Sequence, residues 1–243
     1  MKIATILPIP HLDLIDGDPY HMALAHLCGD KIYADFYRDQ SDKGSFVLLD
    51  NGVVEKHPMP ADQVLRHAER IHADEFILSD SIYNREETLT MGLAAMRVAD
   101  HHGWGGKLMA VPQGDSPMEW MSCLRTMLDW DINSIGISRF VSKYFLDRVD
   151  ALTQAPLLIG SDKEIHLLGC PGDPIEIAEV EKRFPGRVRG TDSGIAAIFT
   201  QEGKKMEERE GKPDVELNFG ESLPVDLLRE NVEYWRERAC PQS

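Results

Sequence analysis

Short apolar runs recur along the chain, and longer stretches with helical periodicity separate them. Most of these runs have the length of a strand and are apolar at nearly every position, which is typical of strands buried on both faces. The predicted strands are Ile3–Leu7, Phe46–Leu49, Glu75–Leu78, Lys107–Val111, Ser134–Ile137, Ile165–Leu168 and Val188–Arg189, with Val215–Asn218 as a weaker eighth.

Between the apolar runs, hydrophobic residues recur at the spacing of one helix face. In the segment 61–71, for example, Val64, Leu65, Ala68 and Ile71 form one stripe. The predicted helices are Ala61–Ile71, Glu86–Ala99, Pro117–Leu128, Ile175–Phe184 and Val225–Trp235.

Strands that alternate with helices indicate parallel pairing and right-handed crossovers. Seven or eight such units in 243 residues fit a (β/α)8 barrel of the TIM type. An open doubly wound sheet usually carries a glycine-rich turn after its first strand, whereas Leu-Pro-Ile-Pro-His follows here at residues 7–11. We therefore expect an α/β protein with a single barrel domain over residues 1–243. A charged segment at residues 200–214 is expected to form a loop or solvated helix inserted before the last strand.

Composition narrows the range of partners. The net charge of −15 argues against a protein that coats nucleic acid non-specifically, because phosphate contacts need clustered Lys and Arg. The start of the chain has no signal-peptide layout, and no apolar run approaches the roughly 18 residues of a membrane span. We therefore expect a cytoplasmic protein with no membrane partner. Cys28, Cys123, Cys170 and Cys240 form no CxxC pair and are expected to be buried thiols.

Polar residues or glycines follow the predicted strands, where a barrel places its active groups. Asp50-Asn51-Gly52 follows one strand and Asp192-Ser193-Gly194 follows another. The strand ends between them supply Asp80, Gln113, Gly114, Gly136 and Gly169. Asp-Asn-Gly and Asp-Ser-Gly are also ordinary turn sequences, and either aspartate alone could simply cap a helix. The repetition at successive strand ends favours one shared pocket.

Three carboxylates and an amide in one pocket suit glycosidic exchange. One carboxylate attacks the anomeric carbon and forms a covalent sugar intermediate, and a second moves protons on the leaving or entering group. A third carboxylate and a glutamine amide can read the donor and acceptor edge of a planar base. Phosphate chemistry would instead need basic residues or a metal cage, and these positions lack Lys and Arg.

The order of the motifs resembles that of the tRNA-guanine transglycosylases, the queuine and archaeosine tRNA-ribosyltransferase superfamily. The family pattern is Asp-Ser-Gly-Gly, an Asp after a strand, Val-Gln-Gly, a Gly-Gly strand end, Met-Gly or Leu-Gly, and finally the nucleophilic Asp. Over roughly residues 46–199, this chain has in the same order Asp50-Asn51-Gly52, Asp80, Pro112-Gln113-Gly114, Ile135-Gly136-Ile137, Leu168-Gly169 and Asp192.

This resemblance implies a fold and a set of roles. It implies a barrel enzyme of the pentosyltransferase type, with Asp192 as the nucleophile that attacks C1′ of the target nucleotide. Asp50 would be the acid/base that handles the proton of the departing or incoming base. The resemblance also implies that no organic cofactor and no metal take part in the reaction.

The base-binding residues are likewise implied by the resemblance. Asp80, Gln113 and the backbone of Gly136 would recognise guanine or a 7-deazaguanine, and Leu168 would lie against the base. The expected substrate-binding set is completed by Asn51, Gly114 and Gly169.

The chain also departs from the family pattern. The tRNA enzymes carry a CxCxxC plus His zinc site near the C-terminus, where this chain has only Cys240, and Ile137 replaces the second glycine of the Gly-Gly strand end. The chain is also much shorter, and so it resembles the short phage and bacterial branch that puts 7-deazaguanines into DNA. The implied partners are a 7-deazaguanine base and a nucleic acid, with DNA favoured over tRNA. A phage-encoded protein would act in the host cytoplasm, and a homodimer is allowed.

Other readings stay open at this point. A hydrolase or transferase acting on free nucleosides or nucleotides suits the charge of −15 better. A non-catalytic barrel subunit is a third class, although the presence of both Asp50 and Asp192 speaks against it. The densest basic cluster comes just before Asp192 and would either position phosphate or form a solvated helix end; its members are Lys182, Arg183, Arg187 and Arg189. Arg139 and Lys143 could extend that basic rim.

Overall fold

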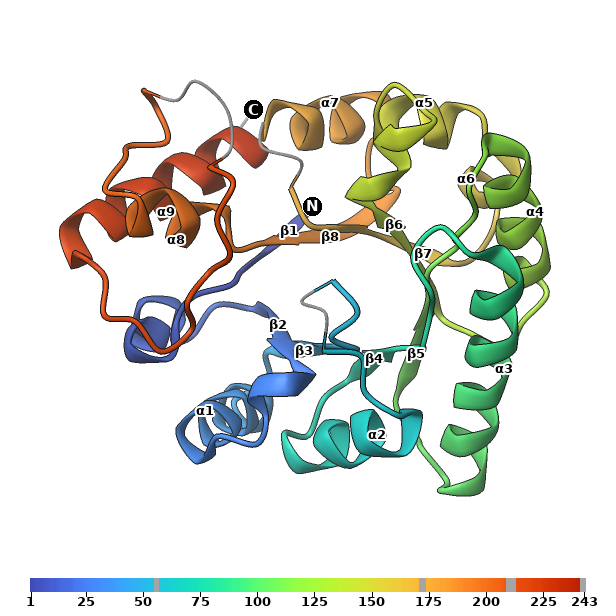
Figure 1. Ribbon diagram of the computed structural model, residues 1–243, viewed down its shortest axis with the longest axis horizontal. Coiled ribbons are helices and arrows are strands. Elements are labelled where there is room, and N and C mark those ends of the chain that lie inside the picture. Colours follow the sequence, from blue (N-terminus) through green and yellow to red (C-terminus); the bar gives the residue numbers. More distant parts are fainter. Residues whose placement is uncertain (55–56, 171–173, 209–212, 241–243) are drawn as a thin grey trace.

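Eight parallel strands form one sheet that curls into a nearly closed barrel (Figure 1). The computed structural model describes residues 1–54, 57–170, 174–208 and 213–240. The strands are β1 (Lys2–Thr5), β2 (Tyr20–Leu24), β3 (Phe46–Asp50), β4 (Glu75–Ile77), β5 (Lys107–Ala110), β6 (Ser134–Ser138), β7 (Glu164–Leu168) and β8 (Val188–Ser193). Their ladder runs β1-β8-β7-β6-β5-β4-β3-β2, and β1 lies beside β2 at the seam. The predicted (β/α)8 barrel is confirmed.

Helices surround the barrel on its outside (Figure 1). They are α1 (Lys31–Asp42), α2 (Ala61–Arg70), α3 (Arg85–His101), α4 (Pro117–Leu128), α5 (Arg148–Thr153), α6 (Pro156–Ile159), α7 (Ile175–Arg183), α8 (Ile195–Gln201) and α9 (Val225–Ala239). The described residues also form the short 3-10 helices η1 (Ile9–Ile15), η2 (Ala25–Leu27) and η3 (Arg139–Lys143). Capping fixes several helix starts, because Asp30, Asn84 and Ser116 accept hydrogen bonds from backbone N–H groups of the first turn.

The eighth strand was predicted in the wrong place. Val215–Asn218 is not a strand, and β2 at Tyr20–Leu24 supplies the missing member of the barrel. All five residues of β2 are buried and pair in parallel with β3. Tyr20 and His21 make the apolar pattern of this strand incomplete, so that periodicity alone does not reveal it.

Two apolar clusters hold the fold together. The larger lies between the sheet and its helices and includes Trp120 and Trp235, both fully buried. The smaller fills the barrel interior with side chains from alternate strand positions, including Met22, Leu48 and Met109. Burial of such side chains provides the main driving force for folding, at about 25 cal/mol per Å² of apolar surface.

The charged segment at residues 200–214 is described only in part, since 209–212 lie outside the described residues. Its first part is fixed to α9: Asn231 on α9 accepts a hydrogen bond from the Met206 backbone N–H and donates one to the Lys204 carbonyl. Met206 is fully buried. The described residues after it form no further strand, so the expected position before a last strand is wrong.

Candidate active site

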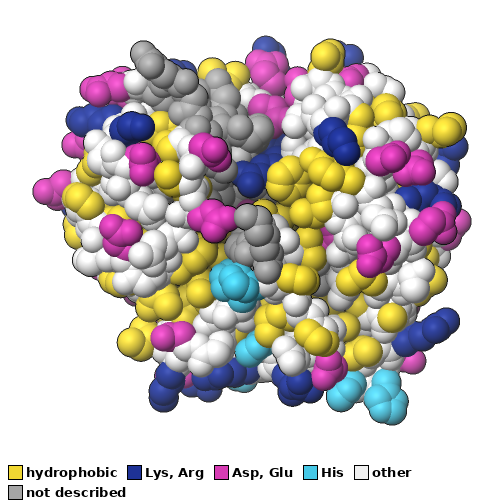
Figure 2. All heavy atoms as spheres, in the orientation of Figure 1, with side chains coloured by type: hydrophobic (Ala, Val, Ile, Leu, Met, Phe, Trp, Pro, Cys, Tyr) yellow, Lys and Arg dark blue, Asp and Glu magenta, His cyan; other side chains and the backbone are white. Residues whose placement is uncertain are grey.

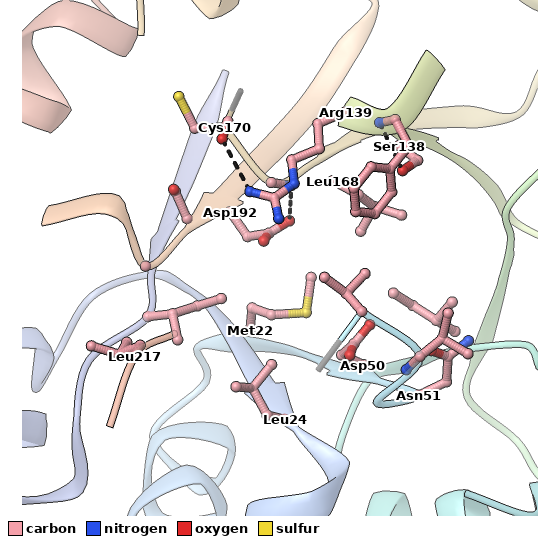
Figure 3. A pocket seen from close by; sticks show the side chains of 18 of the residues that line it. Met22, Leu24, Asp50, Asn51, Ser138, Arg139, Leu168, Cys170, Asp192 and Leu217 are labelled. Carbon is pink, nitrogen blue, oxygen red and sulfur yellow. Dashed lines mark hydrogen bonds between the residues drawn. The ribbon is translucent and has the colours of Figure 1, made fainter. Parts of the chain in front are cut away.

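A cavity of about 300 Å³ opens at the carboxyl ends of the barrel strands. Its size lies at the lower end of the range for small-molecule pockets. Side chains from the ends of β3, β6, β7 and β8 and from the loops after them line it (Figure 3). Of the nine predicted site residues, seven line this cavity: Asp50, Asn51, Asp80, Gln113, Leu168, Gly169 and Asp192. Seven of the nine residues predicted from the sequence thus lie together at one cavity.

Asp192 is held by two polar contacts at the end of β8. Its Oδ1 lies 3.0 Å from Nε2 of His166 and accepts a hydrogen bond of 3.2 Å from the Gly169 N–H. The residue is only 6% exposed. The next helix, α8, begins without a side-chain cap, and Ser193 rather than Asp192 accepts from the Ile195 N–H. Asp192 is therefore not a helix cap.

Asp50 lies across the cavity from Asp192 (Figure 3). It ends β3, and its Oδ2 accepts a hydrogen bond of 2.9 Å from the Gly52 N–H. This bond is the turn contact expected of an Asp-Asn-Gly sequence. Gly52 has a φ of +78°, and a Cβ on it would lie 2.5 Å from the His57 carbonyl oxygen, so only glycine fits this turn. Asp50 also lines the cavity. The Asp-Asn-Gly motif therefore both forms a turn and supplies a carboxylate to the site.

Asp80 is bracketed by two amides. Its two carboxylate oxygens accept hydrogen bonds from Asn51 Nδ2 and Gln113 Nε2, both at 2.7 Å. Burial raises the pKa of Asp80 to about 6, although the two amides oppose that rise. Asn51 is itself fixed by a second bond to the Leu78 carbonyl, and Gln113 accepts from the Tyr83 N–H. The cluster is rigid and ionised near pH 7.

The two other predicted site residues lie outside the cavity lining. Gly136 is in the middle of β6, and a Cβ on it would come within 2.7 Å of the Leu168 side chain and 3.0 Å of Met109. Gly136 therefore makes room for Leu168, which does line the cavity. Gly114 lies against the start of α4, where a Cβ would meet the Trp120 backbone nitrogen at 2.6 Å. Both glycines shape the site by allowing close packing.

One wall of the cavity is apolar and was not foreseen. Met22 and Leu24 of β2 and Leu217 from the segment mistaken for a strand line it (Figure 3). His26 and His57 stack at a centroid distance of 5.2 Å and also line the cavity. The sequence signal for this wall was weak, because the wall is formed by β2 and by a loop that follows much later in the chain.

Charge at the cavity is mixed. Among the described lining residues, the carboxylates of Asp50, Asp80, Asp192 and Glu216 face one guanidinium, that of Arg139. Arg139 packs its guanidinium 5.1 Å from the Phe140 ring, and Lys143 lies 3.9 Å from the Tyr83 ring. Acidic, basic and hydrophobic side chains likewise alternate over the molecular face drawn in Figure 2.

The predicted basic cluster before Asp192 does not form a rim at this cavity. Arg189 begins near the opposite end of β8 and pairs with Glu75 and Glu164. Arg187 donates to the backbone carbonyls of Leu158, Ser161 and Lys163. None of the four basic residues of the cluster is among the described residues that line the cavity.

The described part of the chain shows neither a metal centre nor a membrane-spanning helix. There, no group of three or more His, Cys, Asp or Glu side chains is arranged to hold a metal ion. The four cysteines are free thiols, and Cys28, Cys123 and Cys170 are buried while Cys240 is partly exposed. Each helix within the described ranges is too short or too polar to cross a bilayer.

The fold and cavity define a parallel β/α barrel with a rigid carboxylate and amide set at the carboxyl ends of its strands. No known protein-family model matches the chain. No curated protein matches it significantly in sequence either.

Proposed function

We propose that the protein is a base-exchange transglycosylase that replaces guanine in a nucleic acid with a 7-deazaguanine. The observation that carries this proposal is the placement of Asp192 and Asp50 on opposite sides of one cavity, beside the Asp80 cluster. The motif order that resembles the tRNA-guanine transglycosylases agrees with it. The reaction would be a double displacement with retention of configuration at C1′.

In the first step, a carboxylate oxygen of Asp192 attacks C1′ of the target nucleotide. The bond from C1′ to N9 of guanine breaks, an ester forms between Asp192 and the sugar, and the departing base takes a proton from Asp50. In the second step, Asp50 accepts the N9 proton of the incoming base, whose nitrogen attacks C1′ and releases Asp192. Atoms and protons balance over the cycle, and Asp50 returns to its starting state.

The Asp80 cluster suits recognition of a guanine-like edge. Guanine presents an N1–H and an amino group as donors and O6 as an acceptor. The Asp80 carboxylate has lone pairs left after accepting from two amides, and Gln113 Nε2 has one N–H left after donating to Asp80. Asp80 would accept from the base, and Gln113 would donate to O6.

DNA is the proposed polymer, ahead of tRNA, because the resemblance is to the short branch without a zinc subdomain. A second candidate is exchange or hydrolysis on free nucleosides. The observation that favours this second candidate is the excess of carboxylates over basic side chains at the described cavity lining. Phosphates of a polymer would need basic groups near the cavity mouth, and Arg139 and Lys143 are the nearest candidates on η3.

An incorporation assay tests the proposal. The protein is incubated with radiolabelled guanine or a labelled 7-deazaguanine, together with duplex DNA, single-stranded DNA, tRNA or free guanosine in separate reactions. Label in acid-precipitable DNA is the expected result, and label in tRNA would correct the polymer. Label only in the nucleoside arm would replace base exchange in a polymer by the second candidate. No incorporation and no release of free base in any arm would reject both.

A further inference from the structure

A chain of buried polar groups crosses the barrel interior beneath Asp192. Tyr20 Oη lies 2.8 Å from Nδ1 of His166, and Nε2 of His166 lies 3.0 Å from Oδ1 of Asp192. Arg189 Nε donates to the Tyr20 hydroxyl at 3.1 Å. His166 is 0% exposed and Tyr20 is 1% exposed. Branched apolar side chains normally fill the layers of such a barrel, so four polar groups in a row require an explanation.

The two end members of this row of polar groups, Arg189 and Asp192, fix the donor and the acceptor in each of its hydrogen bonds. Arg189 can only donate, and an ionised Asp192 can only accept. The Tyr20 hydroxyl therefore accepts from Arg189 and donates to Nδ1 of His166, and His166 donates from Nε2 to Asp192. Burial lowers the pKa of His166 and raises that of Tyr20, so both stay neutral near pH 7 and keep this arrangement.

Ion pairs hold Arg189, the end of this row of polar groups that is farthest from Asp192. Arg189 pairs with Glu75 and with Glu164, and Lys107 also binds Glu164 at 2.8 Å. Ser134 donates to the other Glu75 oxygen at 2.6 Å. Glu75 of β4 and Glu164 of β7 thus hold Arg189, which cannot turn away from Tyr20 without breaking its buried ion pair with Glu75.

Packing holds the Tyr20 ring in line with His166. The ring stacks on Phe46 with a centroid distance of 5.4 Å and an interplanar angle of 20°. Gly190 leaves the space for it, because a Cβ there would lie 2.8 Å from the ring. Gly190 therefore makes room for the Tyr20 ring between Arg189 and Asp192, the two members of this row of polar groups that lie on β8.

We infer that Tyr20 and His166 are positioning residues that orient the Asp192 carboxylate for attack on C1′. His166 and the Gly169 N–H both bind Oδ1, whereas no hydrogen bond to Oδ2 comes from any described residue. Oδ2 is then the attacking oxygen, and its direction is set from below by the chain. This role rests on the proposed base exchange, although the tautomer on which it depends does not.

The tautomer of His166 can be measured without any substrate. In ¹⁵N-labelled protein, long-range ¹H–¹⁵N correlations of the imidazole distinguish Nε2–H from Nδ1–H and from the charged ring. The His166→Gln variant assigns the signals. A neutral Nε2–H ring at pH 7 is expected, with Asp192 and Arg189 of β8, Tyr20 of β2 and Glu75 of β4 as the charged or titratable groups that act on it. A charged ring or an Nδ1–H tautomer would overturn the inference.

Kinetics of Tyr20→Phe test the positioning role. This variant keeps the ring on Phe46 but removes the hydroxyl that fixes the His166 tautomer. We expect kcat for exchange to fall roughly 10- to 100-fold, the size usual for loss of an orienting partner, with KM for the incoming base unchanged. Tyr37→Phe is the matched control, since Tyr37 is equally buried but lies on α1, outside this row of polar groups.

The outcomes separate this inference from the proposed function. Wild-type exchange together with a Tyr20→Phe protein at the wild-type kcat would reject the positioning role alone. A similar fall of kcat in Tyr20→Phe and in Tyr37→Phe would mark a general loss of packing and would also reject the positioning role. A wild-type protein without exchange in any arm would reject the proposed function, and the positioning role with it.

Discussion

The two ends of the barrel both carry buried carboxylates, but they hold them in different ways. At the amino-terminal end, Glu75 is fully buried and forms an ion pair with Arg189. At the carboxyl-terminal end, Asp80 is bound by two neutral amides, and Asp192 by a neutral imidazole and a backbone N–H.

This difference distinguishes carboxylates that stabilise the fold from carboxylates that can take part in a reaction. A carboxylate paired with a guanidinium has its charge neutralised. It is therefore a poor nucleophile and a poor hydrogen-bond acceptor for a nucleobase. A carboxylate held only by neutral donors keeps its charge, at the cost of desolvation that shows in the raised pKa of Asp80. Proteins accept such a cost mainly at functional sites, so the carboxyl-terminal end is where the chemistry is expected.

The largest expected effect is the loss of exchange activity when Asp192 is replaced. If this loss did not occur, the distinction between the two ends of the barrel would no longer hold. Asp192→Asn removes the nucleophile, so exchange should fall by at least about 1,000-fold and no covalent adduct should form. Asp50→Asn should still form adduct but turn over roughly 100-fold more slowly. Denaturing electrophoresis with labelled nucleic acid separates the two effects. The exposed residue Asp62 on α2 gives the control, Asp62→Asn.

A wild-type exchange rate in Asp192→Asn would show that the carboxylate is not the nucleophile. Thermal unfolding of each variant is recorded beside the kinetics, because a loss of activity counts only if the barrel is still folded.

The next effect concerns the amino-terminal end and should appear in stability. Glu75→Gln leaves the buried Arg189 with the partly exposed Glu164 as its remaining charged partner among the described residues. We expect the free energy of unfolding in urea to fall by about 3 kcal/mol, near the lower range for a broken buried pair. Glu179→Gln disrupts an exposed pair with Lys182 and should change it by less than about 0.5 kcal/mol. Equal effects of the two changes would refute the paired-end interpretation.

The pKa of Asp80 gives a smaller effect that depends on pH. Its folded-state pKa is about 6, above the ordinary value of about 3.9. Between these two values the folded protein binds the proton and the unfolded chain has lost it, so this group makes stability fall as pH rises from about 4 to about 6. A change of this size corresponds to at most about 3 kcal/mol and levels off above pH 6.

Asp80→Asn removes that titration. Urea unfolding of both proteins from pH 4 to pH 7 should show the variant gaining stability relative to wild type as pH rises. A difference independent of pH would mean that Asp80 titrates normally. In the wild type, KM for the incoming base should also increase as pH falls below about 6, because a protonated Asp80 loses part of its capacity to accept.

Sequence reasoning found the residues whose local signals were strong. Asp50 and Asp192 follow apolar runs and precede glycine turns, so the strand, its end and the polar side chain are all visible within a few residues. The five predicted helices lie close to α2, α3, α4, α7 and α9 for the same reason, and Pro117–Leu128 matches α4 at both ends, whereas α1, α5, α6 and α8 were not predicted.

The chain beneath Asp192 was not predictable in the same way. Tyr20 and His166 are 146 residues apart, and only closure of the barrel brings them together. His166 did leave one signal, as a histidine in the middle of the apolar run Ile165–Leu168, and such a residue in a doubly buried strand needs a partner. The partner itself could not be named, because β2 was missed and Tyr20 lies on it.

The smallest expected effect tests how Gly136 serves the site. In Gly136→Ala, the new Cβ would lie 2.7 Å from the Leu168 side chain, which lines the cavity and must shift to make room. KM for the incoming base should therefore rise several-fold, with kcat nearly unchanged, because the base is displaced while the pair of Asp50 and Asp192 is not. Gly29→Ala is the control, since its Cβ would meet no atom within 4 Å. A fall in kcat at constant KM would instead place the Gly136 backbone at the reacting atoms, and packing against Leu168 would no longer explain the glycine.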